Sequence, residues 1–399
     1  MIKYNIVMKS IHTFYISILI SLISLISASC NNKEFKETPP INISEVEDLV
    51  FPLDDSTVAN MEYIQYFQRN DSNIFAFTNQ YDNSILFYDY DSRKYLKRIS
   101  FDKEGKNGIG NVFSFYYAGK DSIFHYHYNF RTAILTNEKG EVLDKDYIIV
   151  NPNPSPDSLF LAPTLFPRTN SPLKLLNGNL LIPGFLMAEA EGENDTNRPV
   201  MTYFDYKTKE IRHSVCYPQM YHKKNWGGDF TWRTPYYTLS SKNELVFSFS
   251  ADHNIRVHSL FDDKYNEFYA GVGGDYEIEP FEETVVNFKP IDSEKLKRHY
   301  IENLSYGPIH WDKYRDVYYR IAMMPDSDIN INKRPIRKPI EIIVLDKNFN
   351  IIGKSPLKRD KYLINQCFVG LEGFHIQVQT ENDDELRFKT FIIKDDKNK

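Results

Sequence analysis

The chain has 399 residues and a formal net charge of −6, with 42% hydrophobic and 15% aromatic residues. Acidic and basic residues are interspersed along it, which excludes the basic surface that nucleic-acid binding requires. The aromatic residues are mostly Tyr and Phe, 28 of each, and both suit the half-buried surface of a β-sheet. This length fits two or three average domains, but all-β domains of this size also fold as one unit.

The first thirty residues have the pattern of an export signal. Lys3 and Lys9 precede an apolar stretch over residues 14–26, and the small residues 27–29 stand directly before Cys30. A positive start, an apolar centre and a small-residue boundary are the three parts of a secretory signal.

The boundary before Cys30 resembles a bacterial lipobox, in which the mature chain begins with a Cys that carries lipid. Ser27 stands where a Leu is usual. We expect residues 1–29 to be a lipoprotein signal peptide and Cys30 to be lipidated, which would attach the protein stably to a membrane. The alternative is an uncleaved N-terminal anchor helix, because the apolar run is nearly long enough to span a bilayer. The polar, proline-containing residues 30–43 predict a flexible tether.

After the tether, one pattern of strands and hairpin turns recurs six times. Alternating apolar and polar residues are bounded by Asn, Asp, Gly and Ser, as in antiparallel hairpins. Four strands per unit, repeated around a ring, are typical of a β-propeller. We therefore predict an all-β, six-bladed β-propeller with four-stranded antiparallel blades over residues 44–399, with an irregular β-sandwich as the alternative. The copies begin at or near Asn73, Ser122, Asn177, Asn243, Asp316 and Gly373.

The N-terminal strand predicts how the ring closes. The sixth copy provides only three strands, and residues 46–54 form a strand with no partner in their own repeat. Pairing this strand with the last blade would complete the blade and cover an exposed edge. Cys216 falls in the third copy and Cys367 in the sixth, on opposite blades, so we expect no disulfide between them.

Four insertions interrupt the strand pattern, at residues 151–172, 187–199, 290–304 and 325–339. The first is rich in proline and must be irregular. The third predicts a short helix with Asp292 as its N-cap. Loops of this length in a compact domain tend to be functional or mobile.

The lipobox, the tether and the six Tyr- and Phe-rich copies together resemble the TolB-like six-bladed propeller lipoproteins of Bacteroidota, many of them domains of unknown function. The resemblance covers residues 30–399 and rests on the overall pattern. It implies a propeller anchored at the outer membrane, facing the periplasm or the exterior. It brings no agreed catalytic residues to carry over.

No strong catalytic, metal or cofactor motif occurs in the sequence. It has no GxSxG, HExxH, P-loop, CxxC or dinucleotide fingerprint, so we expect no cofactor and assign no catalytic or metal-binding residue. His125 and His127, two apart on one strand, face the same way and could provide two metal ligands. The alternative, which we favour, is a polar strand face.

One segment, residues 217–237, concentrates aromatic and cationic side chains and holds two of the three tryptophans. Trp, Tyr and Arg dominate binding hot spots, and aromatic faces with polar rims suit sugar rings, peptides or proteins. The alternative is that these aromatic side chains seal adjacent blades. The candidate ligand-binding residues are Tyr221, His222, Trp226, Trp232, Arg233, His310 and Trp311.

These features favour a lipid-anchored binding or scaffold module for a glycan, peptide or protein, with its ligand at one mouth of the central channel. The alternative is a glycan- or peptide-directed hydrolase or lyase in the same funnel. Two or three titratable groups within hydrogen-bond reach would distinguish the enzyme. Its candidate polar residues are His125, His127, His222, Arg233 and His310.

Overall fold

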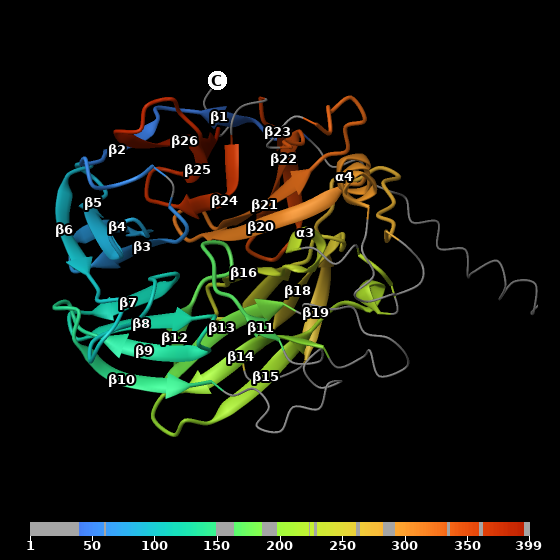
Figure 1. Cartoon of the computed structure of the whole chain (residues 1–399). Coiled ribbons are helices and arrows are strands. Elements are labelled where there is room, and N and C mark those ends of the chain that lie inside the picture. The colour runs from blue at the N-terminus through green and yellow to red at the C-terminus, as the bar shows by residue number, and fades with distance from the viewer. Residues whose placement is uncertain are drawn as a thin grey trace, which may run out of the picture. The chain divides into compact units, whose positions relative to one another are not determined.

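The chain forms an all-β, six-bladed propeller (Figure 1). The computed structural model describes residues 40–59, 61–148, 163–185, 198–222, 224–226, 230–260, 264–281, 292–332, 336–358 and 362–394. The described residues within 38–272 and 276–399 form one compact unit, which contains every strand and helix named below.

Each blade is an antiparallel sheet of consecutive strands, ordered from the ring centre outward. Blade 1 comprises β3 (Ile64–Arg69), β4 (Ser72–Asn79), β5 (Ser84–Asp89) and β6 (Tyr95–Ser100). Blade 2 comprises β7 (Phe115–Gly119), β8 (Ser122–His127), β9 (Thr132–Thr136) and β10 (Val142–Tyr147). Blade 3 comprises β12 (Lys174–Leu176), β13 (Asn179–Phe185), β14 (Pro199–Asp205) and β15 (Ile211–Cys216), and the short β11 (Thr164–Leu165) also pairs with β13.

The remaining three blades follow the same order. Blade 4 comprises β16 (Tyr236–Leu239), β17 (Leu245–Ser248), β18 (Asn254–His258) and β19 (Tyr265–Tyr269). Blade 5 comprises β20 (Ser305–Asp312), β21 (Val317–Met323), β22 (Ile340–Asp346) and β23 (Ile351–Pro356). Blade 6 comprises β24 (Tyr362–Val369), β25 (Phe374–Val378) and β26 (Glu385–Ile393), joined by the N-terminal β1 (Ile43–Glu45) and β2 (Leu49–Pro52).

The predicted closure by the N-terminal strand is confirmed. β2 pairs antiparallel with β26 in the register Leu49↔Phe388, and β1 pairs with the far end of the same strand. Phe51 of β2 is fully buried, and its ring stacks on that of Phe75 in blade 1 with centroids 4.3 Å apart. Pro40 already forms a bridge to Lys354 in β23, so chain pairing begins slightly before the expected boundary at residue 44.

The burial of the strands explains their sequence patterns. Second strands such as β4 are buried along nearly their whole length, because neighbouring blades cover both faces, and their sequences are continuous apolar runs. The outer β10 alternates between exposed and half-buried residues. The hairpin turn between β12 and β13 consists of Asn177 and Gly178. Both residues have positive φ, as a two-residue turn of type I′ requires.

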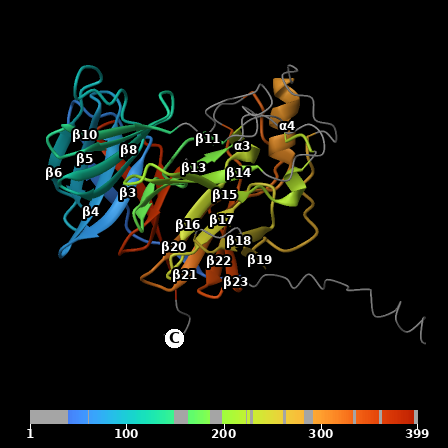
Figure 2. The same ribbon diagram turned by 90° about the horizontal axis from the view of Figure 1, so that it is seen from below.

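The two faces of the ring carry different connections. Inner strands begin at one face, which we call the loop face, and end at the other, the turn face. All four long insertions join strand ends at the loop face, because they either link two blades or link the second and third strands of one blade. The predicted helix is confirmed as α4 (Ser293–Glu302), whose first amides donate to the side chain of Asp292. It lies on the same side as the short α3 (Phe230–Arg233) (Figure 2).

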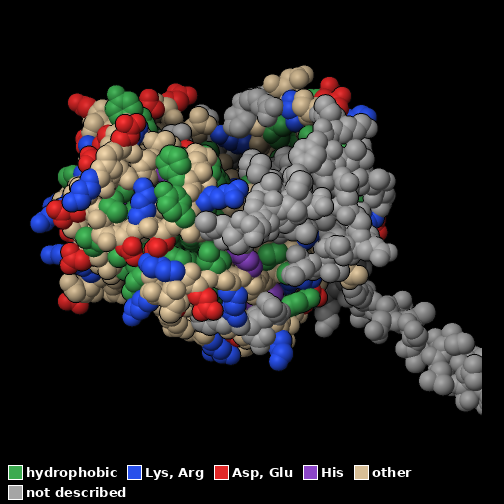
Figure 3. Space-filling model, turned by 60° about the horizontal axis from the view of Figure 1, so that its bottom comes forward, with side chains coloured by type: hydrophobic (Ala, Val, Ile, Leu, Met, Phe, Trp, Pro, Cys, Tyr) green, Lys and Arg blue, Asp and Glu red, His purple; other side chains and the backbone are tan. Residues whose placement is uncertain are grey.

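The distribution of surface charge and the separation of the two cysteines agree with what the sequence predicts. On the side that Figure 3 presents, acidic and basic side chains are interspersed. Cys216, half-buried in the outermost strand of blade 3, and Cys367, buried in the innermost strand of blade 6, form no disulfide with each other, as expected.

Candidate functional site

The inner strands β3, β7, β12, β16, β20 and β24 surround the central channel of the ring (Figure 1). A segment of blade 3, residues 166–173, lies in this channel between β11 and β12, and we call it the channel plug. Its tip is a tight turn in which Arg168 and Ser171 exchange two backbone hydrogen bonds of 2.9 and 3.0 Å. The plug belongs to the proline-rich insertion that the sequence predicted to be irregular.

Hydrogen bonds tie the plug to blades 1 and 6. Thr169 Oγ1 donates to Gln366 Oε1 over 2.9 Å and accepts from the backbone amide of Ile64 over 3.2 Å. The side-chain amide of Asn170 donates to the carbonyl of Ile364 over 3.1 Å. Two innermost strands, β3 and β24, are thereby joined through a turn that belongs to neither of them.

Further contacts tie the plug to blades 1 and 4. The backbone amide of Leu173 donates to the hydroxyl of Tyr63 over 2.7 Å. The amide of Tyr237 donates to the carbonyl of Asn170 over 3.2 Å, and the hydroxyl of Ser171 donates to the carbonyl of Pro235. Because three blades hold it, the plug is a fixed part of the channel, and a cavity lies on each side of it.

The loop-face cavity has a volume of about 220 Å³ and is open to the face that carries the insertions. Its lining lies mostly at or before the starts of inner strands, as with Glu62, Ser114 and Tyr236. It combines an aromatic wall with few polar groups, which is the usual composition of a small-molecule site. The wall consists of Phe113, Tyr126, Tyr128, Phe166 and Tyr236, and the polar groups include Arg168, Asn170, Asn365 and Gln366.

Arg168 is the only basic residue in the described lining of this cavity. Its guanidinium carbon lies 6.0 Å from the ring centroid of Phe166 and 5.9 Å from that of Tyr236. Its Nη2 is buried without a hydrogen-bond partner, and it forms no ion pair with any described residue. Burial lowers the pKa of Arg168, but an arginine in a protein stays protonated, so the cavity holds a positive charge.

The inner cavity, about 230 Å³, lies on the other side of the plug and is lined by Lys174, His310, Trp311 and Cys367, among others. Burial lowers the pKa of Lys174, whose ammonium lies 5.8 Å from the ring centroid of Tyr116. Burial, together with the positive charge of Lys174, lowers the pKa of His310 to about 3. His310 is therefore neutral at physiological pH.

The inner cavity also brings a cysteine and a histidine together. Nε2 of His310 lies 3.2 Å from Sγ of Cys367, which also donates to Oδ1 of Asn170 over 3.4 Å. Burial raises the pKa of the Cys367 thiol well above its ordinary value. A nucleophilic cysteine needs a lowered pKa, so this pair has the protonation states of a packed thiol and a neutral imidazole.

The structure places most of the predicted ligand-binding residues away from both cavities. Tyr221, Trp226 and Trp232 are at most 2% exposed and form a chain of ring contacts at 5.4 and 5.3 Å. Trp232 continues this chain to His299 of α4 at 5.1 Å. Arg233 is also buried, and the segment packs between blades 3 and 4, which favours the packing alternative for these side chains.

The other predicted residues have mixed placements. His310 and Trp311 line the inner cavity, whereas the half-buried His222 lines neither cavity. Nε2 of His125 lies 2.9 Å from the hydroxyl of Thr136, and the ring of His127 stacks on an exposed Phe. Within the part of the chain that is described, no three His, Cys, Asp or Glu side chains gather as a metal site would require.

The residues that sequence reasoning missed lie in the plug and directly after it. Arg168, Asn170 and Lys174 were passed over because a proline-rich loop indicates irregular backbone without indicating where it lies. One signal was available: a cationic and an amide side chain stand between Pro167 and Pro172, inside an insertion too long to be a simple turn.

Comparisons with known proteins agree with this fold. A family model described as "Domain of unknown function (DUF4221)" matches residues 40–355. The crystal structure of a member of that family from Bacteroides vulgatus superposes with a TM-score of 0.75 at 22% identity, covering 90% of this chain and 99% of that one. A Bacteroides fragilis protein inferred to be exported superposes with a TM-score of 0.53 at 12% identity, covering 88% and 96%. These identities support the fold alone.

No curated protein matches the chain. Among the helices of the described ranges, none is long and apolar enough to cross a membrane.

Proposed function

This chain belongs to the DUF4221 family, and from that premise we propose that it is an exported binding module that holds a small ligand in the loop-face cavity. The observation that carries the proposal is the lining of this cavity, where an aromatic wall surrounds a guanidinium, that of Arg168, which has no ion-pair partner among the described residues. An aromatic wall supplies contact area, and a few fixed polar groups set the orientation of a ligand.

The way the plug is held supports binding. Arg168 sits on a turn whose neighbours Thr169 and Asn170 are hydrogen-bonded to blades 1, 4 and 6. A side chain on such a turn is already in place before a ligand arrives, which lowers the entropy lost on binding. The cavity opens at the strand ends that the four insertions join, and a larger partner such as a glycan or peptide chain would continue there.

The alternative function, a glycan- or peptide-directed hydrolase or lyase, has less support. Catalysis of that kind needs two or three titratable groups within reach of one another. In the described lining of the loop-face cavity the one carboxylate, that of Glu62, is exposed and accepts a hydrogen bond from Gln80 over 2.6 Å. The neutral His310–Cys367 pair lies on the other side of the plug.

We also propose that the protein is exported and anchored at the outer membrane by lipid on Cys30. Residues 1–39, which contain the signal and Cys30, lie outside the described residues, so this proposal rests on the lipobox pattern. The Bacteroides fragilis relative inferred to be exported is in keeping with it.

The proposal is tested by blocking the loop-face cavity. The protein, purified from membranes in detergent, is screened against glycan and peptide libraries, and each hit is titrated against an Asn365→Trp variant. Asn365 is exposed and lines the cavity, so an indole there should fill the mouth without disturbing the core. The matched control is Asn348→Trp, in the exposed β22–β23 turn on the opposite face.

We expect Asn365→Trp to weaken binding at least tenfold and Asn348→Trp to leave it unchanged. Hits that bind both variants as they bind the parent would show that the ligand does not use the cavity. Conversion of a hit into product by the parent protein would favour the hydrolase or lyase instead.

A further inference from the structure

We propose that the ligand of the loop-face cavity carries a carboxylate, which the guanidinium of Arg168 binds, on a ring that packs against the aromatic wall. This inference rests on the proposed function and adds the chemical class of the ligand.

The loop-face cavity carries a positive charge that no described residue neutralises. A buried cation without a partner is costly, and proteins normally pair such a charge or hydrogen-bond it. Nη2 of Arg168 has neither kind of partner. Glu62, the one acidic residue in the described lining, lies beyond ion-pair distance of Arg168. The cation of the inner cavity, Lys174, lies across the plug and does not line the loop-face cavity.

Arg320, which is fully buried, provides a comparison, because its guanidinium donors all have acceptors within the protein. Arg320 in blade 5 donates to the carbonyls of His253, Ala270 and Asp252 over 2.6–3.0 Å and to the hydroxyl of Ser248 over 2.9 Å. It lines neither cavity. Its donors are used up by the protein, whereas the half-buried Arg168 lines the loop-face cavity and its Nη2 has no partner in the protein, so the two arginines have different roles.

The geometry of the donor favours a carboxylate over other anions. A guanidinium is planar and presents two parallel N–H groups, which match the two oxygens of a carboxylate. Within the loop-face cavity the single positive charge of Arg168 would balance the single negative charge of a carboxylate. A phosphate ester carries close to two charges at neutral pH and would leave one of them without a partner in this lining.

The aromatic wall defines the remainder of the ligand. Phe113 and Tyr128 make a ring contact at 4.6 Å, Tyr128 and Phe166 another at 4.9 Å, and Phe166 and Tyr236 flank the guanidinium. This wall continues directly from the cation, so a ring attached to the bound carboxylate would lie against it. At about 220 Å³ the cavity is smaller than the roughly 300–1,000 Å³ of drug-sized sites, so it accommodates one ring.

The test uses probes that differ only in charge. Glucuronate, glucose and glucose 6-phosphate share one sugar ring, and phenylacetate and phenylacetamide share one aromatic ring. Each is titrated by calorimetry or ligand-observed NMR into the parent protein and three variants. Arg168→Gln removes the charge, Arg168→Lys keeps the charge but loses the paired donors, and Arg298→Gln removes an exposed arginine of α4 as the matched control.

We expect the parent to bind at least one of the two acids at least tenfold tighter than its neutral partner and tighter than the phosphate. Arg168→Gln should abolish this preference, Arg168→Lys should retain part of it, and Arg298→Gln should retain all of it. The melting temperature of Arg168→Gln should fall little, because Nη2 of Arg168 has no hydrogen-bond partner and the guanidinium forms no ion pair with a described residue; a large fall would mark Arg168 as a packing residue.

Any of the following results would overturn the inference. They are equal binding of acid and neutral probes by the parent, a preference that survives in Arg168→Gln, and a preference for the phosphate. Failure of both acids to bind also counts against it. If neutral hits from the library screen still bind and Asn365→Trp still blocks them, the binding function stands and only the ligand class is wrong. If nothing binds in the cavity, the proposed function fails as well.

Discussion

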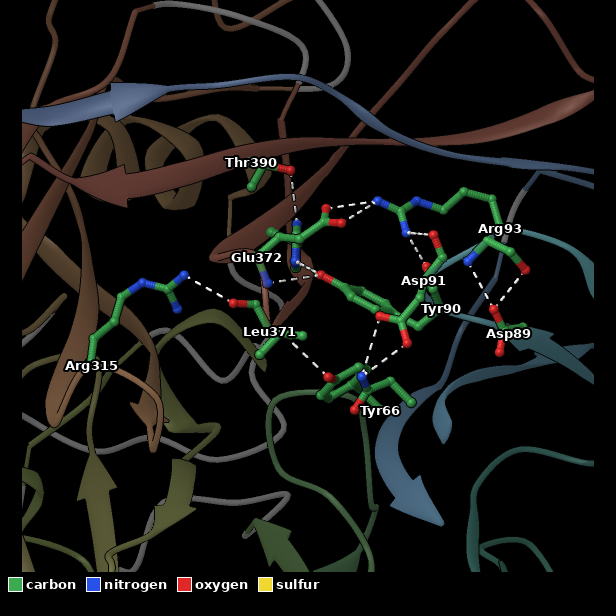
Figure 4. Close-up of polar contacts among 12 residues, drawn as sticks. Tyr66, Asp89, Tyr90, Asp91, Arg93, Arg315, Leu371, Glu372 and Thr390 are labelled. Carbon is green, nitrogen blue, oxygen red and sulfur yellow. Dashed lines mark hydrogen bonds and ion pairs between the residues drawn. The ribbon is translucent and has the colours of Figure 1, made fainter. Parts of the chain in front are cut away.

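The hydroxyl of Tyr90 in blade 1 and Nε2 of His375 in blade 6 share a hydrogen bond of 2.8 Å, although 285 positions separate them in the chain. The same hydroxyl accepts from the backbone amide of Glu372, and the carboxylate of Glu372 pairs with both of its oxygens to Arg93 at 2.6 and 2.7 Å (Figure 4). This latch fastens the first blade to the last on the turn face. The ring is thus closed twice, by the β2–β26 pairing and by the latch.

Replacing Tyr90 by Phe should destabilise the propeller by about 1–3 kcal/mol, because it leaves the buried imidazole of His375 and the amide of Glu372 without this partner. The free energy of unfolding in urea measures the change. Tyr95→Phe is the matched control, since Tyr95 is 49% exposed on the outer strand of the same blade. Equal stabilities of the two variants would show that the latch contributes nothing.

The N-terminal strand β2 should contribute more to the free energy of unfolding than its short length suggests. Phe51→Ala removes a ring that is fully buried between blades 6 and 1, and changes of this kind cost about 3–5 kcal/mol. Val46→Ala, at an exposed position in the link between β1 and β2, is the control. Deletion of residues 44–56 should go further and open blade 6. A deletion variant that melts at the temperature of the parent would contradict closure by β2.

The fold could be predicted because its signals are local. Asn177–Gly178 encodes a hairpin turn whatever surrounds it, and the alternation in β10 encodes one exposed face. The unpaired strand around Leu49 could be assigned to the last blade by elimination, since an antiparallel blade lacking one strand needs an edge partner. Repetition of one pattern then sets the number of blades.

The site could not be predicted in the same way, because its position depends on contacts between distant segments. Trp226 and Trp232 have the composition of a binding surface, but helix α4, more than fifty residues further on, covers the latter through His299. Arg168 stands in a loop with no periodicity, and only its neighbours' bonds to residues 64, 364 and 366 place it in the channel. Composition identifies side chains able to bind and leaves their exposure open.

The proposed lipidation can be tested by removing the sulfur of Cys30. Cys30→Ala should release the protein from membranes or leave it as an unprocessed precursor, because the proposed lipidation attaches diacylglycerol to this sulfur. Metabolic labelling with a radiolabelled or clickable fatty acid measures the outcome. Cys216→Ala, at the half-buried thiol of β15, is the control and should remain labelled. Labelling of Cys30→Ala at the level of the parent would show that the lipobox assignment is wrong.

The buried histidines predict a loss of stability in mild acid. Burial lowers the pKa of His125, His310 and His375 to about 3 in the folded protein, while in the unfolded chain a His titrates near 6.5. Above pH 6.5 neither the folded nor the unfolded protein binds a proton at these histidines, so the free energy of unfolding has its full value. Between pH 6.5 and 3 only the unfolded chain takes it up, so the free energy of unfolding falls as the pH falls.

At pH 4.5 each of these histidines should cost on the order of 2–3 kcal/mol relative to pH 7.5, since one pKa unit corresponds to about 1.4 kcal/mol. Burial raises the pKa of Asp252 and Glu341, which opposes the effect in part. Urea unfolding between pH 7.5 and 4.5 measures the slope. In His310→Gln the slope should be shallower, because an amide that can still reach the Cys367 thiol no longer titrates. A parent protein whose stability is constant over this range would show that these imidazoles are protonated, or reached by water, in the folded state.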